Sequence, residues 1–384
     1  MKKLVAVSII LVMVHTLFAA AVFSKTIVSS LPVLSSEAAI VMEATTGQVL
    51  YEKNARSQMY PASVTKIATA IYAIENGSLS DVVTISSKAR STVGTRVYLE
   101  EGEQVTLEKL LLGLLVNSGN DAGVAVAEHI SGSVELFASD VNLYLKDVIG
   151  LQDTNFENPH GLFDPEHVTT AQDLSVLTRY AMKNEEFMKM FGTKELPWNG
   201  ESWDTTLYTH HKLLREKPYE GVTGGKNGFV PEAGVTLVTT ADRENLNLIV
   251  VTLKSESEAE AYNDTVQLLD FGFDNFETTS IPTNSRFLAG EVEYITPREI
   301  AYTHQAGEQV AIDVTENGKL MVTDQDGILL SSYQFPVISD SAQKRSSIQK
   351  DSGSFVEHAF SYSLWLLLIG GSILSLVYYR SRKN

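Results

Sequence analysis

The sequence predicts a mixed α/β (α+β) domain in which helices pack on an antiparallel sheet, followed by a small all-β domain and a C-terminal transmembrane helix. Three observations support this prediction. Strand-like segments stand on both sides of a long helical stretch, so one sheet is expected to form from both ends of that region. From about residue 282 the pattern changes to short alternating segments separated by turns. An uncharged apolar run occupies residues 359–379.

The first 24 residues are typical of a secretory signal peptide. They carry a lysine pair, an uncharged apolar run and small residues near their end. We expect cleavage near residues 21–24. An uncleaved signal anchor is the alternative, and it would leave the following residues on the same side of the membrane.

The first predicted domain spans residues 35–276. Two short apolar runs around a Thr-Thr-Gly turn predict a hairpin over 38–54. A largely helical stretch follows from Ala62 to about Lys183, and Asn-Ser-Gly-Asn breaks two apolar helices within it. A second cluster of strands begins at "EGVTGGKNGFV", and "LLDFGFDNF" closes the domain. Strands therefore flank helices, as the predicted fold requires.

The rest of the chain predicts a small domain, a tether and a membrane anchor. Residues 282–338 favour five short strands, with turns at Gln-Ala-Gly, Glu-Asn-Gly and Asp-Gln-Asp-Gly. Residues 339–358 form a polar tether. Residues 359–379 are long enough to cross a bilayer and are followed by "RSRKN", which places the tail in the cytoplasm. We therefore expect an exported, membrane-anchored protein whose domains lie outside the cytoplasm.

Composition excludes several functions. The formal net charge of −17 argues against a nucleic-acid partner. The absence of cysteine excludes a disulfide framework, a thiol nucleophile and a Cys-ligated metal. Four histidines stand in predicted loops without metal-binding spacing, so we expect neither a metal nor a cofactor; they are His160, His167, His210 and His211.

A candidate nucleophile lies in "PASVTKIATA", residues 61–70. A helix that starts near Ala62 places Ser63 and Lys66 on one face, because residues three apart are neighbours on a helix. A lysine in a desolvated pocket loses affinity for its proton and can accept one from a serine hydroxyl. The motif alone is weak evidence, since Ser-x-x-Lys recurs twice in the polar tether.

Two further motifs strengthen this candidate. "VNSGNDAG" contains Ser118 and Asn120 in an interhelical turn, and "VTGGKNGFV" places Lys226 and Gly228 at the head of a strand. In this order the three motifs resemble the S-x-x-K, S-x-N and K-T-G elements of serine penicillin-binding proteins and β-lactamases. The segments "PASVTK", "NSGNDA", "NPHGL" and "LLDFGF" are similar to the low-molecular-weight penicillin-binding proteins, the serine-type D-alanyl-D-alanine carboxypeptidases.

The resemblance covers roughly residues 35–276 and implies a penicillin-binding/β-lactamase-like fold. It implies that Ser63 attacks the carbonyl between two D-alanines of a peptidoglycan stem peptide, with Lys66 as general base. The other implied roles are proton relay through Ser118 and Lys226, amide binding by Asn120, and an oxyanion hole of backbone N–H groups on Ser63 and Phe229. Such an enzyme acts on the bacterial cell wall and is inhibited by β-lactams.

One departure from the family pattern bears on activity. The third motif reads Lys226-Asn227-Gly228, and the nearby stretch 253–262 offers only Lys254 where an arginine is common. One lost hydrogen bond to a charged group costs about 1.5 to 3 kcal/mol, or roughly 10- to 150-fold. A weakened or inactive peptidoglycan- or β-lactam-binding protein therefore remains an alternative, and a β-lactamase is a second one.

Overall fold

The computed structural model describes residues 31–336. The predicted signal peptide (1–24), the tether (339–358) and the transmembrane helix (359–379) lie outside the described residues. Within 31–336, no helix has the length and apolar character needed to cross a membrane.

A five-stranded antiparallel sheet forms the centre of the larger part of the chain, with the strand order β2-β1-β9-β8-β7. Its strands are β1 (Ala38–Glu43), β2 (Val49–Lys53), β7 (Val222–Val230), β8 (Gly234–Arg243) and β9 (Leu246–Ser255). β1 pairs with β9 in a register that places Ile40 opposite Val251. Segments from both ends of the domain therefore share one sheet, which confirms the predicted mixed α/β domain with an antiparallel sheet.

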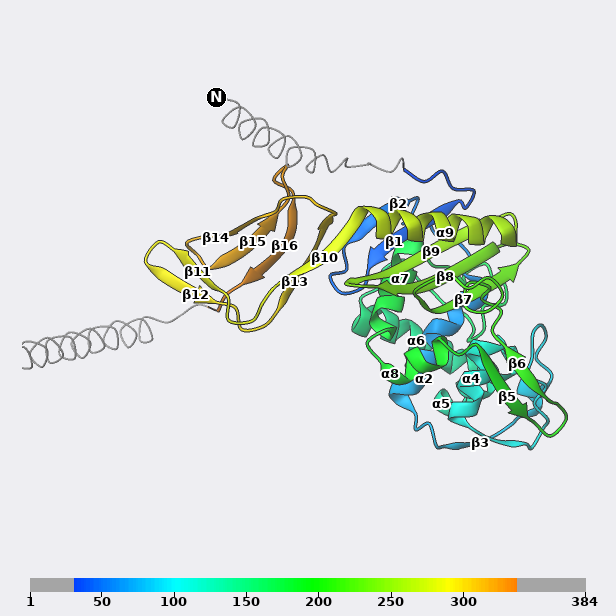
Figure 1. The fold of residues 1–384 in the computed structure, drawn as a ribbon. Helices are drawn as coiled ribbons and strands as arrows, with labels where there is room; N and C mark the ends of the chain where they lie inside the picture. Colours follow the sequence, from blue (N-terminus) through cyan, green and yellow to red (C-terminus); the bar gives the residue numbers. More distant parts are fainter. Residues whose placement is uncertain (1–30, 337–384) are drawn as a thin grey trace, which may run out of the picture. The chain divides into compact units, whose positions relative to one another are not determined.

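Helices cover both faces of this sheet. Figure 1 shows α9 (Glu258–Asn275) along β8 and β9 on one face, while α7 (Ala171–Ala181) packs on β1 and β9 from the other. All six residues of β1 are buried. Alternate residues of this strand enter different cores: Ile40 packs among the helices below the sheet and Val41 packs toward α9. Burial on both faces explains why β1 is a continuous apolar run.

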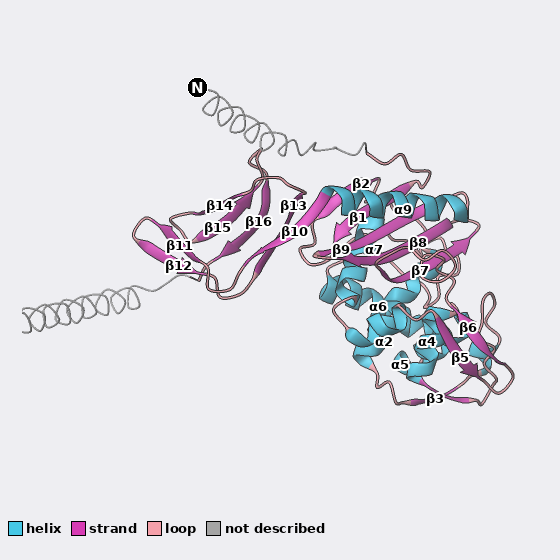
Figure 2. Cartoon of the chain, in the orientation of Figure 1, coloured by secondary structure: helices cyan, strands magenta, loops and turns pink. Residues whose placement is uncertain are grey.

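The helical layer surrounds α2 (Lys66–Asn76), which contacts most of its other helices. The sequence "KIATAI" is apolar nearly all round and its side chains are buried, as expected for a helix at the centre of a core. The layer, which is cyan in Figure 2, also contains α3 (Ser87–Arg90), α4 (Leu107–Val116), α5 (Asn120–Ser131), α6 (Val134–Tyr144) and α8 (Glu185–Phe191). Two small antiparallel sheets of two strands each border it. One pairs β3 (Val82–Thr84) with β4 (Gln104–Thr106), and the other pairs β5 (Glu195–Asn199) with β6 (Asp204–Tyr208).

The chain after α9 consists of strands. β10 (Phe276–Ile281) pairs with β13 (Ile300–Gln305), and β11 (Arg286–Ala289) pairs with β12 (Val292–Ile295). A three-stranded sheet contains β14 (Ala311–Val314), β15 (Lys319–Thr323) and β16 (Leu329–Gln334). Within the described residues, six strands begin after residue 282, one more than the sequence predicts. The turn at Gly290, with φ 62°, joins β11 to β12 and was not among the predicted turns.

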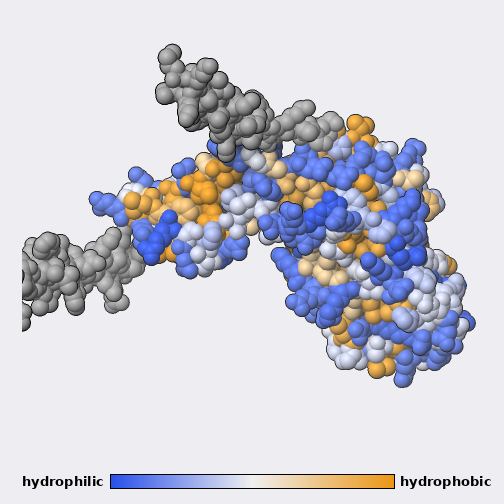
Figure 3. All heavy atoms as spheres, viewed as in Figure 1, coloured by the Kyte–Doolittle hydropathy of each residue, from blue (hydrophilic) through white to orange (hydrophobic). Residues whose placement is uncertain are grey.

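The described chain divides into two compact units. The first contains residues 31–282, 299–311 and 322–331, and the second contains 283–298, 312–321 and 332–336. Figure 3 shows hydrophilic side chains over much of the visible face of the first unit, in keeping with the acidic composition. All the predicted site residues lie in this first unit.

Candidate active site

The candidate nucleophile sits on a short helical turn directly before α2. Ser63 belongs to the 3-10 turn η1 (Ala62–Thr65), and Lys66 is the first residue of α2. The ammonium nitrogen Nζ of Lys66 donates to Ser63 Oγ over 2.9 Å. Ser63 is half-buried, whereas Lys66 is completely buried. A serine hydroxyl at the surface of the site is therefore bonded to an amine that water does not reach.

Lys66 has two further acceptors. Its Nζ donates to Asn120 Oδ1 over 2.8 Å and to the His160 carbonyl over 2.7 Å. Burial lowers the pKa of Lys66 well below its ordinary value, the positive charge of Lys226 lowers it further, and Asp121 opposes both. Both main causes disfavour the ammonium form. The amine is consequently easier to deprotonate than a surface lysine, which a general base requires.

The loop between α4 and α5 supplies the second group of polar side chains. Ser118 is a buried non-glycine residue with φ 61°, in the left-handed region, and Asn120 opens α5. Asn120 Nδ2 donates to the Val93 carbonyl over 2.8 Å, while its Oδ1 receives the Lys66 bond. The Asp121 carboxylate accepts the backbone N–H of Val97 over 3.0 Å. These bonds fix the loop beside Lys66.

Strand β7 forms the third wall of the site. Lys226 is buried, its pKa is lowered to about 7 by that burial, and its Nζ donates to the Asn227 carbonyl over 2.8 Å. Asn227 is half-buried and Phe229 is exposed. A Cβ added to Gly228 would lie 2.4 Å from the Ser63 nitrogen. Glycine at this position is therefore what allows β7 to approach the nucleophile turn.

β7 is an edge strand of the five-stranded sheet. The side of β7 that faces away from β8 has no partner strand among residues 31–336. An exposed edge of backbone N–H and C=O groups can pair with an extended peptide. β8 supports this edge from behind, where Thr236 Oγ1 donates to the Pro61 carbonyl over 2.8 Å. The site thus combines a nucleophile, a buried amine and a docking edge for peptide backbone.

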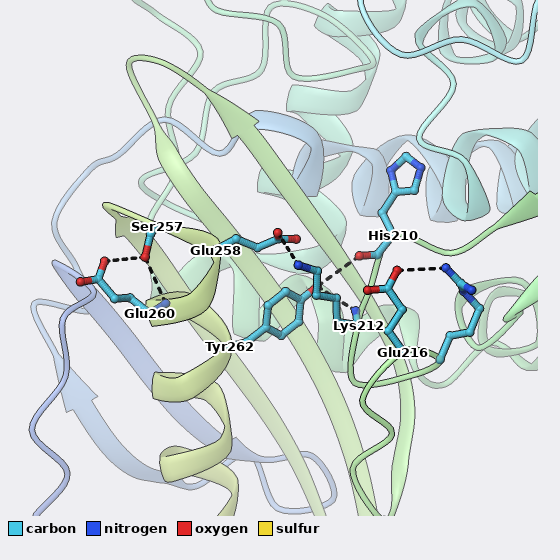
Figure 4. Close-up of polar contacts among 8 residues, drawn as sticks. His210, Lys212, Glu216, Ser257, Glu258, Glu260 and Tyr262 are labelled. Atoms are coloured by element: carbon cyan, nitrogen blue, oxygen red, sulfur yellow. Dashed lines mark hydrogen bonds and ion pairs between the residues drawn. The ribbon is translucent and has the colours of Figure 1, made fainter.

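The loop that precedes β7 is held by α9 (Figure 4). The Tyr262 hydroxyl donates to the His210 carbonyl over 3.2 Å and accepts the Lys212 backbone N–H over 2.9 Å. His211 stands between His210 and Lys212 in the chain, and its ring lies against Gly225. A Cβ added to Gly225 would be 2.3 Å from that ring. The His211 Nε2 bonds Thr239 Oγ1 over 2.8 Å. These contacts fix the backbone one residue before Lys226.

The structure brings together the side chains of Ser63, Lys66 and Asn120 through direct hydrogen bonds. Lys254, the sole base in 253–262, instead pairs with Glu37 at the surface over 2.7 Å. The four histidines form no metal-binding group with acidic side chains in the described part of the chain. The sequence did not predict that the His160 carbonyl accepts from Lys66 or that Thr236 bonds the Pro61 carbonyl. The segment "NPHGL", which contains His160, is the one signal that pointed to this part of the site.

The chain is similar to known proteins over most of its length. A family model described as D-alanyl-D-alanine carboxypeptidase matches residues 25–257. The D-alanyl-D-alanine carboxypeptidase DacF of Bacillus subtilis is 36% identical over 285 residues, which is 72% of each chain. The D-alanyl-D-alanine carboxypeptidase DacD of Salmonella typhimurium is 35% identical over 272 residues, or 68% of each chain.

Solved structures show the same fold. Penicillin binding protein 5 from Haemophilus influenzae is 26% identical with a TM-score of 0.71, covering 80% of this chain and 98% of that one. Penicillin binding protein 6B from Escherichia coli is 29% identical with a TM-score of 0.69, covering 79% and 96%.

Proposed function

The chain belongs to the D-alanyl-D-alanine carboxypeptidase family of serine penicillin-binding proteins, and we propose that it removes the terminal D-alanine from peptidoglycan stem peptides through an acyl-enzyme on Ser63. The observation that carries this proposal is the 2.9 Å bond from the buried Lys66 amine to the Ser63 hydroxyl. A serine is a weak nucleophile until an adjacent base accepts its proton. In this structure the Lys66 amine is the base next to the Ser63 hydroxyl.

Acylation requires Lys66 to lose one proton first, so that the Ser63 hydroxyl donates to Nζ where Nζ now donates to Oγ. Neutral Lys66 then accepts the Ser63 proton while Oγ attacks the carbonyl carbon between the two D-alanines. The developing oxyanion would be stabilised by the backbone N–H groups of Ser63 on η1 and Phe229 on β7. The close approach of Gly228 to the Ser63 nitrogen supports this role.

Collapse of the tetrahedral intermediate breaks the peptide bond, and the departing D-alanine nitrogen must gain a proton. Ser118 and Lys226 would relay to it the proton that Lys66 took from Ser63, which returns Lys66 to its neutral form; both residues are buried, and they belong to the loop and the strand beside Lys66. Water then attacks the ester and regenerates Ser63. No group outside the protein, the substrate and water is needed in this sequence.

Asn120 would hold the substrate amide, and its two existing bonds fix the amide plane before substrate arrives. Asn227 would donate to the terminal carboxylate, with the Lys226 charge behind it. Asn227 is half-buried on the edge strand, so part of its side chain is open to solvent. β-Lactams would acylate Ser63 by the same attack, which is the basis of the penicillin-binding names.

We propose that residues 35–276 form the catalytic domain, with residues 282–338 as an all-β spacer domain. The signal-peptide pattern of residues 1–24 and the apolar run 359–379 support export and anchoring to the bacterial cell membrane, through the tether at 339–358. An anchored enzyme of this kind acts on the cell wall from outside the cytoplasm.

The test is D-alanine release from an acyl-Lys-D-Ala-D-Ala peptide by the full-length chain, with Ser63→Ala as the control. The proposal requires release by the wild type and none by the variant. Peptide binding without release would favour the binding-only alternative, for which Asn227 is the motivating residue. Rapid turnover of a chromogenic cephalosporin would favour a β-lactamase.

A further inference from the structure

The backbone directly before the nucleophile is in an unfavourable conformation. Ala62 has φ 49°, in the left-handed region that L residues with a side chain rarely occupy. Such a conformation persists only when surrounding contacts hold it. Because Ser63 follows Ala62 directly, whatever holds Ala62 also sets the direction of the Ser63 hydroxyl.

The Ala62 carbonyl is held from within the turn. The Thr65 hydroxyl donates to it over 2.8 Å. From the other side, Gly161 approaches so closely that an added Cβ would lie 1.8 Å from the Ala62 oxygen. Thr65 is itself buried, so water cannot replace its hydroxyl.

His167 orients the Thr65 hydroxyl, and the hydrogen bonds define its tautomer. The Glu157 backbone N–H donates to His167 Nδ1 over 3.0 Å, so Nδ1 carries a lone pair. Thr65 has already used its one proton on Ala62. The 2.8 Å contact between Thr65 Oγ1 and His167 Nε2 therefore has Nε2–H as its donor.

We propose that the chain of hydrogen bonds from His167 through Thr65 to the Ala62 carbonyl is a positioning device that holds Ser63 in attacking geometry. The hydrogen bonds of Lys66 Nζ go to Ser63, Asn120 and the His160 carbonyl, so we assign His167 and Thr65 as positioning residues rather than catalytic ones. This inference rests on the proposed function, because it concerns the acylation of Ser63.

The surroundings of His167 keep it in the neutral form that the chain of bonds needs. The ring is stacked on Phe156 with centroids 4.8 Å apart and is nearly inaccessible. Burial lowers the pKa of His167 to about 4, the nearby Asp164 carboxylate opposes the shift, and the positive charge of Lys66 adds to it. The neighbouring His160 ring is also neutral near pH 7, since burial lowers its pKa to about 3. If Nδ1 were protonated, its N–H would face the backbone N–H of Glu157, and the hydrogen bond between them would be lost.

The matched variants are Thr65→Val against Thr65→Ser, and His167→Leu against His167→Gln. Valine keeps the shape of threonine without the hydroxyl, whereas serine keeps the hydroxyl. Glutamine can place an N–H donor near the position of Nε2, whereas leucine cannot. Loss of one buried hydrogen bond should slow acylation roughly 10-fold, the factor that corresponds to about 1.4 kcal/mol.

The experiment measures the acylation of the full-length protein by a fluorescent penicillin, separating the rate constant of acylation from the affinity of the preceding complex. We expect Thr65→Val and His167→Leu each to lower the rate constant with little change in affinity. The double variant should be no slower than the slower single one, because both changes break the same chain. Thr65→Ser and His167→Gln should stay close to the wild type.

Three results would overturn the inference: a wild-type acylation rate in Thr65→Val, an equal loss in Thr65→Ser, or fully additive effects in the double variant. Thermal melting of each variant identifies one that acylates slowly only because it has unfolded. If Thr65→Val is unfolded, the comparison of His167→Leu with His167→Gln tests the inference in its place. A wild type that penicillin does not acylate would instead contradict the proposed function.

Discussion

Replacing Gly228 by alanine should separate β7 from the nucleophile turn. The added Cβ would lie 2.4 Å from the Ser63 nitrogen, 2.7 Å from Thr236 Oγ1 and 3.0 Å from the Ala62 Cβ. The first of these neighbours is backbone and cannot rotate away. Restoring ordinary contact at 3.4 Å from this nitrogen requires a displacement of about 1 Å.

A displacement of this size falls where the reaction is most sensitive to geometry. A misplacement of about 1 Å between reacting groups can cost about 10²-fold in rate. The same substitution overpacks the domain and should cost about 1 to 3 kcal/mol of stability. We therefore expect Gly228→Ala to fold at room temperature but to acylate about 100-fold more slowly.

The assay is the second-order rate constant of acylation by a fluorescent penicillin, together with D-alanine release. Gly272→Ala is the matched control, because its Cβ would meet Leu248 Cδ1 at 2.5 Å within the core between α9 and the sheet. It should lose stability without losing acylation rate. An acylation rate for Gly228→Ala within a few-fold of the control would refute the argument that β7 and η1 form one reacting surface.

Three further predictions concern the base, the substrate carboxylate and acid stability. Lys66→Arg should lower acylation by about 10² to 10⁴, measured with the same penicillin, because arginine keeps the charge but cannot be deprotonated. Asn227→Ala should reduce D-alanine release roughly 10- to 150-fold while Asn227→Thr preserves it, and equal rates in all three proteins would contradict a carboxylate contact. The free energy of unfolding, from urea titrations, should fall as the pH drops from about 6.5 toward 4. Burial lowers the pKa values of His160, His167 and His211 to about 3, 4 and 3, so the unfolded chain binds protons first. His211→Leu should make that fall shallower, and an unchanged slope would be the contrary result.

The sequence predicts the fold well where local patterns are strong. The continuous apolar run of β1 and the Thr-Thr-Gly turn after it indicate a buried hairpin, and the strand pattern from Val222 to Ser255 predicts the rest of the sheet. A single sheet from both ends of the domain follows because strands on both sides of a helical stretch must bury their faces together, whereas the pairing of β1 with β9 is seen only in the structure. The turn at Gly290 was missed because one glycine within an alternating run is a weak signal.

The site was predictable only for residues within recognisable motifs. The spacing of Ser63 and Lys66 predicts a shared face, and the structure places a hydrogen bond there. The roles of Thr65, His167 and the His160 carbonyl could not be read in advance. They depend on a loop about 100 residues downstream that folds back on η1, and no local pattern encodes that contact.

The central claim is that Ser63 is the nucleophile activated by the buried Lys66 amine. Its most direct test is the mass of the protein after incubation with penicillin, followed by identification of the modified peptide. We expect one added penicillin per chain, carried by Ser63 and absent from Ser63→Ala. A label on another residue, or an unmodified wild-type chain, would contradict it.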